Sequence, residues 1–184
     1  MVRTHPRLET ERLKLRPFLP EDAISFSATA GAREVADTLL SLPFPFSESA
    51  ARTTIAANAS EFQQSRALHF GVQLKSENAL VGGVDLRDID REHQQAELSF
   101  WVAKDRWNNG FAAEAAAAVL SWTFRELALN RIYACHMLRN PASGAVLQKL
   151  GMKVEGTMRE RVRKWGVFED VALLSLLRSD FSEA

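Results

Sequence analysis

The stretch from Ala96 to Leu120 constrains the fold most, because it predicts a strand, a tight turn and a helix in immediate succession. Residues 96–102 alternate in polarity as a half-buried strand does, and residues 111–127 place small and apolar side chains at helical spacing. A short turn separates them. The first turn of a helix offers backbone N–H groups without internal partners, at the positive end of the helix dipole. The turn therefore predicts an anion site.

The residues of this turn suit a backbone that approaches a ligand closely. Gly110 has no side chain to obstruct contact, and Asn108 and Asn109 tolerate left-handed conformations. Arg106 adds a permanent positive charge. The turn has no Gly-Lys-Ser/Thr and only one glycine, which excludes a Walker loop and a dinucleotide fingerprint. From these residues alone, an ordinary strand-to-helix turn remains the alternative interpretation.

Further motifs occur at characteristic spacing along almost the whole chain. Together they resemble the GCN5-related N-acetyltransferase (GNAT) superfamily, and more closely its bacterial RimJ/RimL-like branch of ribosomal-protein N-terminal acetyltransferases. The matching motifs are Leu8–Pro17, Trp107-x-x-Gly110-Phe111-Ala112 with Glu114, Asn140-x-x-Ser143, Lys149-Leu-Gly-Met152 and Gly166-x-x-x-Asp170.

The order of predicted elements is that of an α+β protein with one domain over residues 1–184. The resemblance implies a mixed, mostly antiparallel seven-stranded sheet flanked by helices, with strands 92–102 and 131–137 splayed apart to hold the coenzyme. The predicted strands are 8–16, 68–75, 79–87, 92–102, 131–137, 152–164 and 167–178, and the predicted helices are two within 21–40, one from 47 to 66, 111–127 and 142–150.

Composition excludes several classes of function. Lys and Arg number 23 and Asp and Glu number 23, so nothing indicates a nucleic-acid partner or a polybasic membrane contact. No apolar run reaches the ~18–20 residues of a membrane span, and the opening residues Met1–Pro6 do not resemble a signal peptide. The single cysteine, Cys135, rules out an intrachain disulfide and fits a reducing, cytoplasmic location.

The resemblance implies acetyl-CoA as co-substrate and no metal. The loop would bind the coenzyme pyrophosphate, the exposed edge of the preceding strand would pair with the pantetheine amides, and the start of the helix at 142–150 would contact the coenzyme arm. The residues expected to bind the coenzyme are Phe100, Trp101, Val102, Arg106, Trp107, Asn108, Asn109, Gly110, Phe111, Ala112, Asn140 and Ser143.

Glu97 is the candidate catalytic base. Strand parity places it with Ser99 and Trp101 on one face, opposite Ala96, Leu98, Phe100 and Val102, which are expected to be core. A mid-strand glutamate either faces water at a sheet edge or serves chemistry, and the central position that the resemblance implies favours chemistry. His136 is a rival base, although a strand histidine bonded locally is the commoner situation.

The proton donor for the departing thiolate is less clearly marked. Many family members use a tyrosine where this chain has Leu147, and the resemblance to the RimJ/RimL-like branch suggests Ser143 as a substitute. Ser143 could equally be a hydroxyl that bonds the helix backbone. Asn108 and Ser99 also stand where the family often has glycine. Cys135 lies in an apolar strand with no sign of activation, which argues against a nucleophilic role.

The resulting hypothesis is acetyl transfer from acetyl-CoA to a primary amine by direct attack through a tetrahedral intermediate. The acceptor is a protein N-terminus, such as that of a ribosomal protein, or a small amine. A basic run, Arg159 to Lys164, argues against a polycationic acceptor, although such runs are usually solvated strand faces. The alternative is a non-catalytic acyl-CoA-binding regulatory module. The resemblance also suggests a homodimer, since relatives often dimerise.

Overall fold

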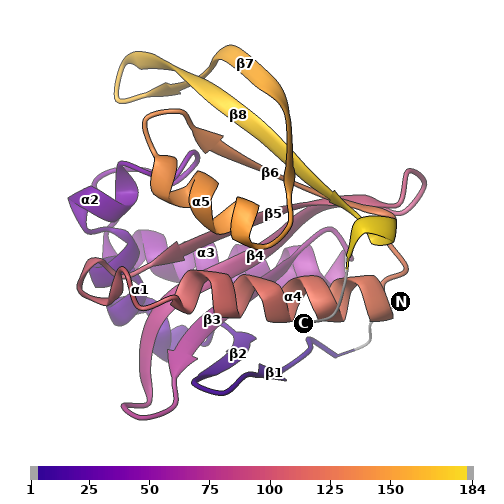
Figure 1. The fold of residues 1–184 in the computed structure, drawn as a ribbon. Helices are drawn as coiled ribbons and strands as arrows, with labels where there is room; N and C mark the ends of the chain where they lie inside the picture. The colour runs from indigo at the N-terminus through magenta and orange to yellow at the C-terminus, as the bar shows by residue number, and fades with distance from the viewer. Residues whose placement is uncertain (1–3, 182–184) are drawn as a thin grey trace.

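The computed structural model describes residues 4–181. The predicted domain covers residues 1–184, so its first three and last three residues lie outside this range. The first three residues of Met1–Pro6, the opening that does not resemble a signal peptide, are among them. The described chain forms one mixed sheet of eight strands in the order β1-β2-β3-β4-β5-β6-β8-β7 (Figure 1). The strands are β1 Leu8–Glu9, β2 Leu13–Pro17, β3 Leu68–Leu74, β4 Ala79–Asp90, β5 Gln95–Val102, β6 Arg131–Met137, β7 Lys153–Lys164 and β8 Val167–Leu177.

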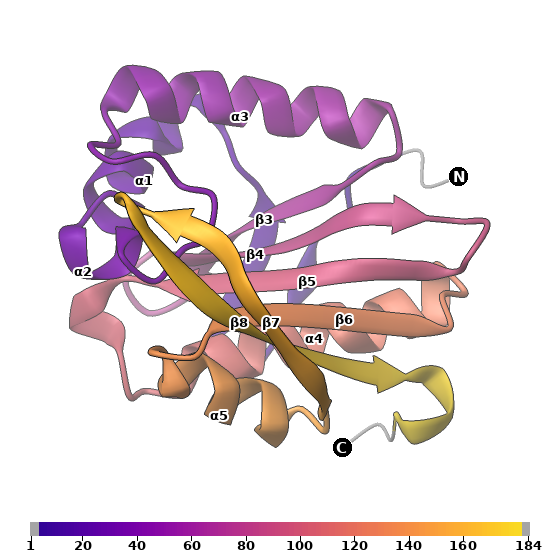
Figure 2. The same ribbon diagram turned by 90° about the horizontal axis from the view of Figure 1, so that it is seen from above.

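Helices cover both faces of the sheet, as expected for the α+β class. Figure 2 shows α3 on one side of the strands and α4 with α5 on the other. Each side has its own apolar core: α4 packs on β2, β4 and β5, while α1 and α3 enclose a smaller cluster with Phe18, Leu80 and Trp101. The helices are α1 Ala23–Ala30, α2 Arg33–Ala36, α3 Glu48–Gln63, α4 Phe111–Glu126 and α5 Pro141–Lys149.

The prediction of one strand over residues 8–16 is wrong. This part of the chain forms two short strands, so the sheet has eight strands instead of the predicted seven. The chain turns back between β1 and β2, which pair antiparallel with Leu8 opposite Leu15. Glu114 of α4 holds this turn by accepting hydrogen bonds from the Thr10 hydroxyl and the Arg12 amide. A contact between residues about a hundred positions apart therefore sets a turn that has no glycine or proline of its own.

The predicted splayed strand pair is confirmed. β5 and β6 are parallel partners only where Gln95–Glu97 face Arg131–Tyr133. Beyond that point β5 stays paired with β4 as far as Val102, and β6 stays paired with β8 as far as Met137. The two strands diverge there, and every other strand pair in residues 4–181 is antiparallel.

The Gly82–Gly83 pair lies at both a bulge and a close approach of side chain to backbone. The register between β3 and β4 shifts at Val72, and a Cβ at Gly83 would lie 2.5 Å from the Trp101 indole nitrogen. The indole in turn stacks on Phe26 of α1, with ring centroids 5.6 Å apart. Glycine at this position therefore lets Trp101 lie flat against β4 and close one end of the second core.

The two aromatic residues of the loop before α3 lie in different surroundings. Phe46 is buried against Phe26, whereas Phe44 is exposed. The described residues contain no helix long and apolar enough to cross a membrane.

Candidate active site

A cavity of about 180 Å³ opens where β5 and β6 diverge. Its walls come from β3 to β6, from α1, α3 and α5, and from the segment between α2 and α3. The polar residues that β3 to β6 and α5 contribute to it are His69, Asp85, Arg87, Glu97, Ser99, Cys135, His136 and Ser143.

Glu97 lies in the cavity wall on a central strand, so the solvent-edge alternative for this residue is wrong. Its side chain is 15% exposed and accepts a hydrogen bond from Arg87 at 3.2 Å. Burial raises the pKa of Glu97 above its ordinary value, against the opposing charge of Arg87. A carboxylate with a raised pKa is better matched to taking a proton near neutral pH.

His136 also lines the cavity, but its contacts are those of a residue that packs β6 against α5. Its Nδ1 lies 2.9 Å from the carbonyl of Met137, and its Nε2 would lie 2.8 Å from a Cβ at Gly144. The ring is thus wedged between β6 and α5 with a local hydrogen bond, the commoner situation for a strand histidine. Cys135 is its neighbour on the other face of β6, and burial raises the pKa of this thiol to about 11. A thiol of that pKa is a poor nucleophile near neutral pH.

Asn140 and Ser143 form a reciprocal cap at the start of α5. The Asn140 side chain accepts from the Ser143 amide at 3.3 Å and donates to the Ser143 hydroxyl at 2.8 Å. Since the hydroxyl oxygen already accepts from Asn140, its own proton is left to point elsewhere, and Ser143 lines the cavity. Leu147, at the position where the family often has tyrosine, is buried in the same wall. The two roles considered for Ser143, a hydrogen bond within the helix cap and proton donation in the cavity, are therefore compatible.

The turn between β5 and α4 has the backbone that its sequence indicated. Asn108 and Gly110 both have positive φ, 62° and 78°, and α4 begins at Phe111 with Ala112 in its first turn. Asn109 stabilises the turn by donating to the carbonyls of Arg106 and Trp107. A Cβ at Gly110 would meet only the Arg12 guanidinium, at 3.6 Å, so the approach to this helix end is open.

Two arginines lie near this helix end, and both are paired with carboxylates. Arg106 donates two hydrogen bonds to Glu77 in the turn between β3 and β4 and a third to Asp105. Arg12, which the sequence did not single out, is paired with Glu114 and lies over the Phe111 ring at 4.6 Å. Arg12 comes from the β1–β2 turn, and no local pattern connects it with α4.

The free edge of β5 faces the gap between the strands. Ala103 donates to Val81 of β4, so the alternate residues Val102 and Phe100 direct their main-chain groups the other way. The Trp107 indole already donates to the Val102 carbonyl at 2.8 Å. Phe100 and Val102 are only half-buried, which corrects their assignment to the core, whereas Trp101 is buried opposite Gly83.

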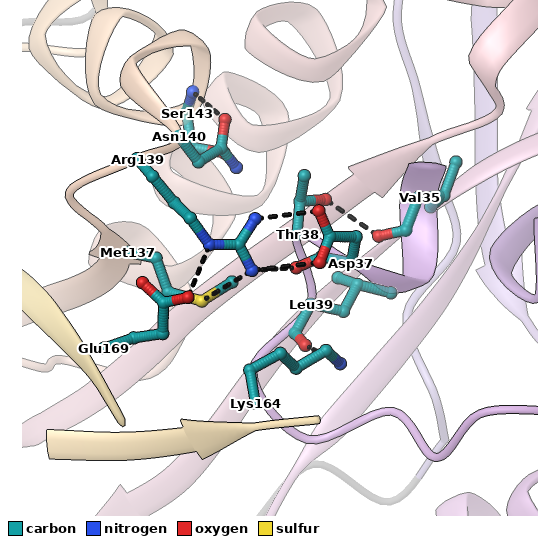
Figure 3. Close-up of polar contacts among 10 residues, drawn as sticks. All are labelled: Val35, Asp37, Thr38, Leu39, Met137, Arg139, Asn140, Ser143, Lys164 and Glu169. Carbon is teal, nitrogen blue, oxygen red and sulfur yellow. Dashed lines mark hydrogen bonds and ion pairs between the residues drawn. The ribbon is translucent and has the colours of Figure 1, made fainter. Parts of the chain in front are cut away.

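Figure 3 shows the polar contacts that hold the segment after α2, residues of which line the cavity. Arg139, next to Asn140, donates to the Asp37 carboxylate and to Glu169 of β8 at 2.8 Å each. Lys164 donates to the carbonyls of Leu39 and Leu42. Lys164 is therefore buried, whereas the other basic residues of its run, Arg159, Arg161 and Arg163, are exposed. The segment is thus tied to the same turn that carries the start of α5.

A second polar group in the cavity was missing from the sequence-based site. His69, Asp85 and Ser99 lie side by side on three adjacent strands and are joined by hydrogen bonds. Parity on β3 and β4 could have suggested a shared face, but their register across the sheet was needed to align them. No cluster of His, Cys, Asp and Glu within residues 4–181 is arranged to hold a metal ion.

This chain matches a known protein family and related proteins over most of its length. The family described as Acetyltransferase (GNAT) domain matches residues 12–153. The uncharacterized N-acetyltransferase YoaA of Bacillus subtilis is 30% identical over 173 residues, which cover 94% of this chain and 97% of YoaA. The uncharacterized N-acetyltransferase p20 of Bacillus licheniformis is 30% identical over 95% of this chain and 98% of its own.

Solved structures agree with the fold. Mycobacterium smegmatis RimJ in complex with CoA-disulfide superposes with a TM-score of 0.89 at 21% identity, over 98% of this chain and 91% of RimJ. The ribosomal-protein-S5-alanine acetyltransferase of Vibrio fischeri gives 0.85 at 21% identity, over 97% and 100%. At these identities the likeness shows a shared fold. The chain therefore belongs to the GNAT family of acetyltransferases and is an N-acetyltransferase that uses acetyl-CoA.

Proposed function

We propose that this N-acetyltransferase acetylates the α-amine of a polypeptide N-terminus, with Glu97 as the base and Ser143 as the proton donor. The observation that carries the proposal is the position of Glu97. It is a partly buried carboxylate on a cavity wall, at the point where β5 and β6 separate.

The proposed path of the coenzyme follows the free edge of β5 and the turn after it. The backbone N–H groups of Asn108 to Ala112, at the positive end of α4, would hold the pyrophosphate. The main chain of Phe100 and Val102 would pair with the pantetheine arm, with Asn140 on the opposite side. Arg12 and Arg106 are both cations near the phosphates, and each is already paired with a carboxylate, Arg12 with Glu114 and Arg106 with Glu77.

The thioester of acetyl-CoA is already activated, so no covalent enzyme intermediate is required. The amine nitrogen attacks the thioester carbonyl carbon, forming a tetrahedral intermediate whose collapse breaks the C–S bond. Glu97, directly or through a water, takes the proton that the amine loses. The departing thiolate takes a proton from the Ser143 hydroxyl, whose oxygen is already engaged by Asn140, and the serine regains a proton from water as Glu97 releases its own to solvent.

The acceptor preference rests on charge and on pKa. An α-amine has a pKa of about 7.7–8.0, against about 10.4 for lysine, so a single carboxylate deprotonates it with less difficulty. Arg87 lines the cavity, and Arg161 lies close enough to influence the pKa of Glu97. Both oppose a polycation. The spermidine N(1)-acetyltransferase of Vibrio cholerae, 28% identical over 55% of this chain and 59% of its own, keeps a small polyamine as the second candidate.

Thiol release from acetyl-CoA against a panel of acceptors tests the proposal. The panel comprises peptides with alanine or serine at a free N-terminus, the same peptides with a blocked N-terminus, spermidine, free amino acids and an aminoglycoside. Release with the free peptides and none with the blocked ones is expected. Release with spermidine alone would overturn the acceptor assignment, and coenzyme binding without release for any amine would favour a regulatory module.

Two further expectations remain proposals. β7 is an edge strand, and the β7–β8 turn exposes Trp165, Val167 and Phe168, which would suit contact with a second copy of the chain. Light scattering on the purified protein measures whether it is a homodimer.

The unpaired Cys135 is consistent with the expected cytoplasmic location.

A further inference from the structure

Three side chains form a row across the cavity wall, two residues along the strands from the Arg87–Glu97 pair. His69 of β3 faces Asp85 of β4, and Asp85 faces Ser99 of β5. His69 Nδ1 lies 2.9 Å from one oxygen of the Asp85 carboxylate, and the Ser99 hydroxyl donates to the other at 3.2 Å. All three residues line the cavity.

The row is anchored from the helix above it. Glu61 of α3 lies 2.8 Å from His69 Nε2, so both ring nitrogens face carboxylates. Only the imidazolium form donates to both. Burial lowers the pKa of His69, but the hydrogen bonds and charges of Asp85 and Glu61 outweigh it and raise the pKa above its ordinary value. In the imidazolium form of His69, the group of Glu61, His69 and Asp85 carries two negative charges and one positive charge, and its net charge is negative.

The side of the row that faces the cavity offers hydrogen-bond acceptors. The Ser99 proton is engaged by Asp85, so the lone pairs of its oxygen remain for a ligand. Each Asp85 oxygen has one donor and can accept another. Ser99 and Glu97 share a face of β5 two residues apart, roughly 6.6 Å along the strand, and both line the cavity, so they face the same ligand space.

We propose that Ser99 and Asp85 bind the acceptor amine beside Glu97, and that His69, anchored by Glu61, is the positioning residue for Asp85. The inference rests on the proposed transfer to an amine and assigns the groups that receive it. The net negative charge of the row complements an incoming ammonium ion. Its N–H donors then match Ser99, Asp85 and Glu97, and Glu97 is left in place to take the proton.

A purely structural role would have different consequences. Glu61 and His69 also fasten α3 to the sheet, so a loss of stability alone would not identify a binding role. A binding role instead changes the KM for the acceptor, with little change in kcat or in the affinity for acetyl-CoA. The split between these constants distinguishes the two roles.

The test uses the full-length protein, acetyl-CoA and a neutral peptide with a free N-terminal alanine. Asp85→Asn is expected to raise the KM for the peptide about tenfold, because it replaces a charge-assisted hydrogen bond with a neutral one. Ser99→Ala and His69→Gln should each raise it about threefold, which is a smaller change of the same kind. The double variant of His69→Gln and Asp85→Asn should bind the peptide no worse than Asp85→Asn alone, since His69 acts through Asp85.

Glu155→Gln is the matched control. Glu155 is likewise a carboxylate held by a cation and a serine hydroxyl, Arg131 and Ser175, but it lies outside the cavity. This variant should leave the KM for the peptide unchanged. Ser99→Ala removes a single hydroxyl and carries the test if Asp85→Asn does not fold.

The outcomes separate this inference from the proposed function. If the wild-type chain transfers acetyl groups to no amine, the proposed function fails. If the wild-type chain is active but Asp85→Asn and Ser99→Ala keep its KM, only the present inference is overturned. A fall in kcat with unchanged KM would likewise assign these residues to another step.

Discussion

The two faces of β5 show how one strand divides structural and chemical roles between alternate residues. Ala96 and Leu98 point toward α4 and are at most 1% exposed. Glu97 and Ser99 point the other way, toward the cavity, and carry a carboxylate and a hydroxyl into a partly buried wall. The period of two along a strand makes this division unavoidable once both faces are covered.

The difference teaches that stability and activity are separable at neighbouring positions. Apolar burial on the α4 side contributes favourably to folding. Burial on the cavity side raises the pKa of Glu97, which means that the folded state disfavours its charged form. Substitutions on the two faces should therefore affect different measurements.

The largest expected effect is on the cavity face. Glu97→Gln keeps the shape of the side chain but cannot accept the amine proton, so kcat should fall about 10²- to 10⁴-fold. Stability and protection by acetyl-CoA against heat should be nearly unchanged. Thiol release and thermal denaturation measure both. Full activity in this variant would remove Glu97 from the chemistry and bring His136 forward.

Leu98→Ala tests the opposite face. It leaves a cavity in the core beneath α4 and should lower the free energy of unfolding by about 2–5 kcal/mol. Urea denaturation followed by circular dichroism measures the loss. A loss below about 1 kcal/mol, within the range of surface changes, would show that this face is less tightly packed than its burial indicates.

Gly110→Trp separates the cavity face from the turn that follows β5. A side chain at this left-handed position blocks the approach to the N-terminus of α4, so the heat protection by acetyl-CoA should be lost. At a hundredfold excess over Kd this protection amounts to about 2.7 kcal/mol.

Gly166→Trp is the control for this variant. Gly166 also has positive φ, 90°, with open space around it, but it lies in the β7–β8 turn. Its variant should keep the protection by acetyl-CoA. Equal protection in both variants would exclude the turn after β5 from coenzyme binding.

Arg87→Gln should have the smallest effect, a shift in the pH profile. Arg87 lowers the pKa of Glu97 against the larger effect of burial, so its removal should raise that pKa further. A base acts only above its pKa, so the acid limb of kcat/KM should move to higher pH. The shift should be about one unit or less, as for a single partly exposed ion pair. A shift to lower pH would contradict the assignment of the limb to Glu97.

Local patterns predicted much of the fold and part of the site. The alternation of β5 placed Glu97 and Ser99 together, Gly110 and Asn108 indicated the left-handed turn, and Asn140 before Pro141 indicated a capped helix. Each of these depends on neighbours within a few residues. Local geometry is sufficient there, because φ preferences, caps and strand period act over one or two turns of chain.

Local patterns could not predict the contacts between segments that are distant in the sequence. The β1–β2 turn depends on Glu114, and Arg106 is engaged by Glu77. Lys164 reads as one member of an exposed basic run, yet it is buried against the carbonyls of Leu39 and Leu42. The pairing partner of a charged side chain is set by which segments the fold brings together, and sequence spacing carries no record of it.

The sequence by itself determined the family, the strand–turn–helix unit and the face of β5 on which Glu97 lies. Only the tertiary structure decided that His69, Asp85 and Ser99 form one row beside it, with Glu61 behind. The physical reason is register. Alternation fixes which face a residue takes, but the hydrogen-bonded alignment of three strands fixes which residues on that face become neighbours.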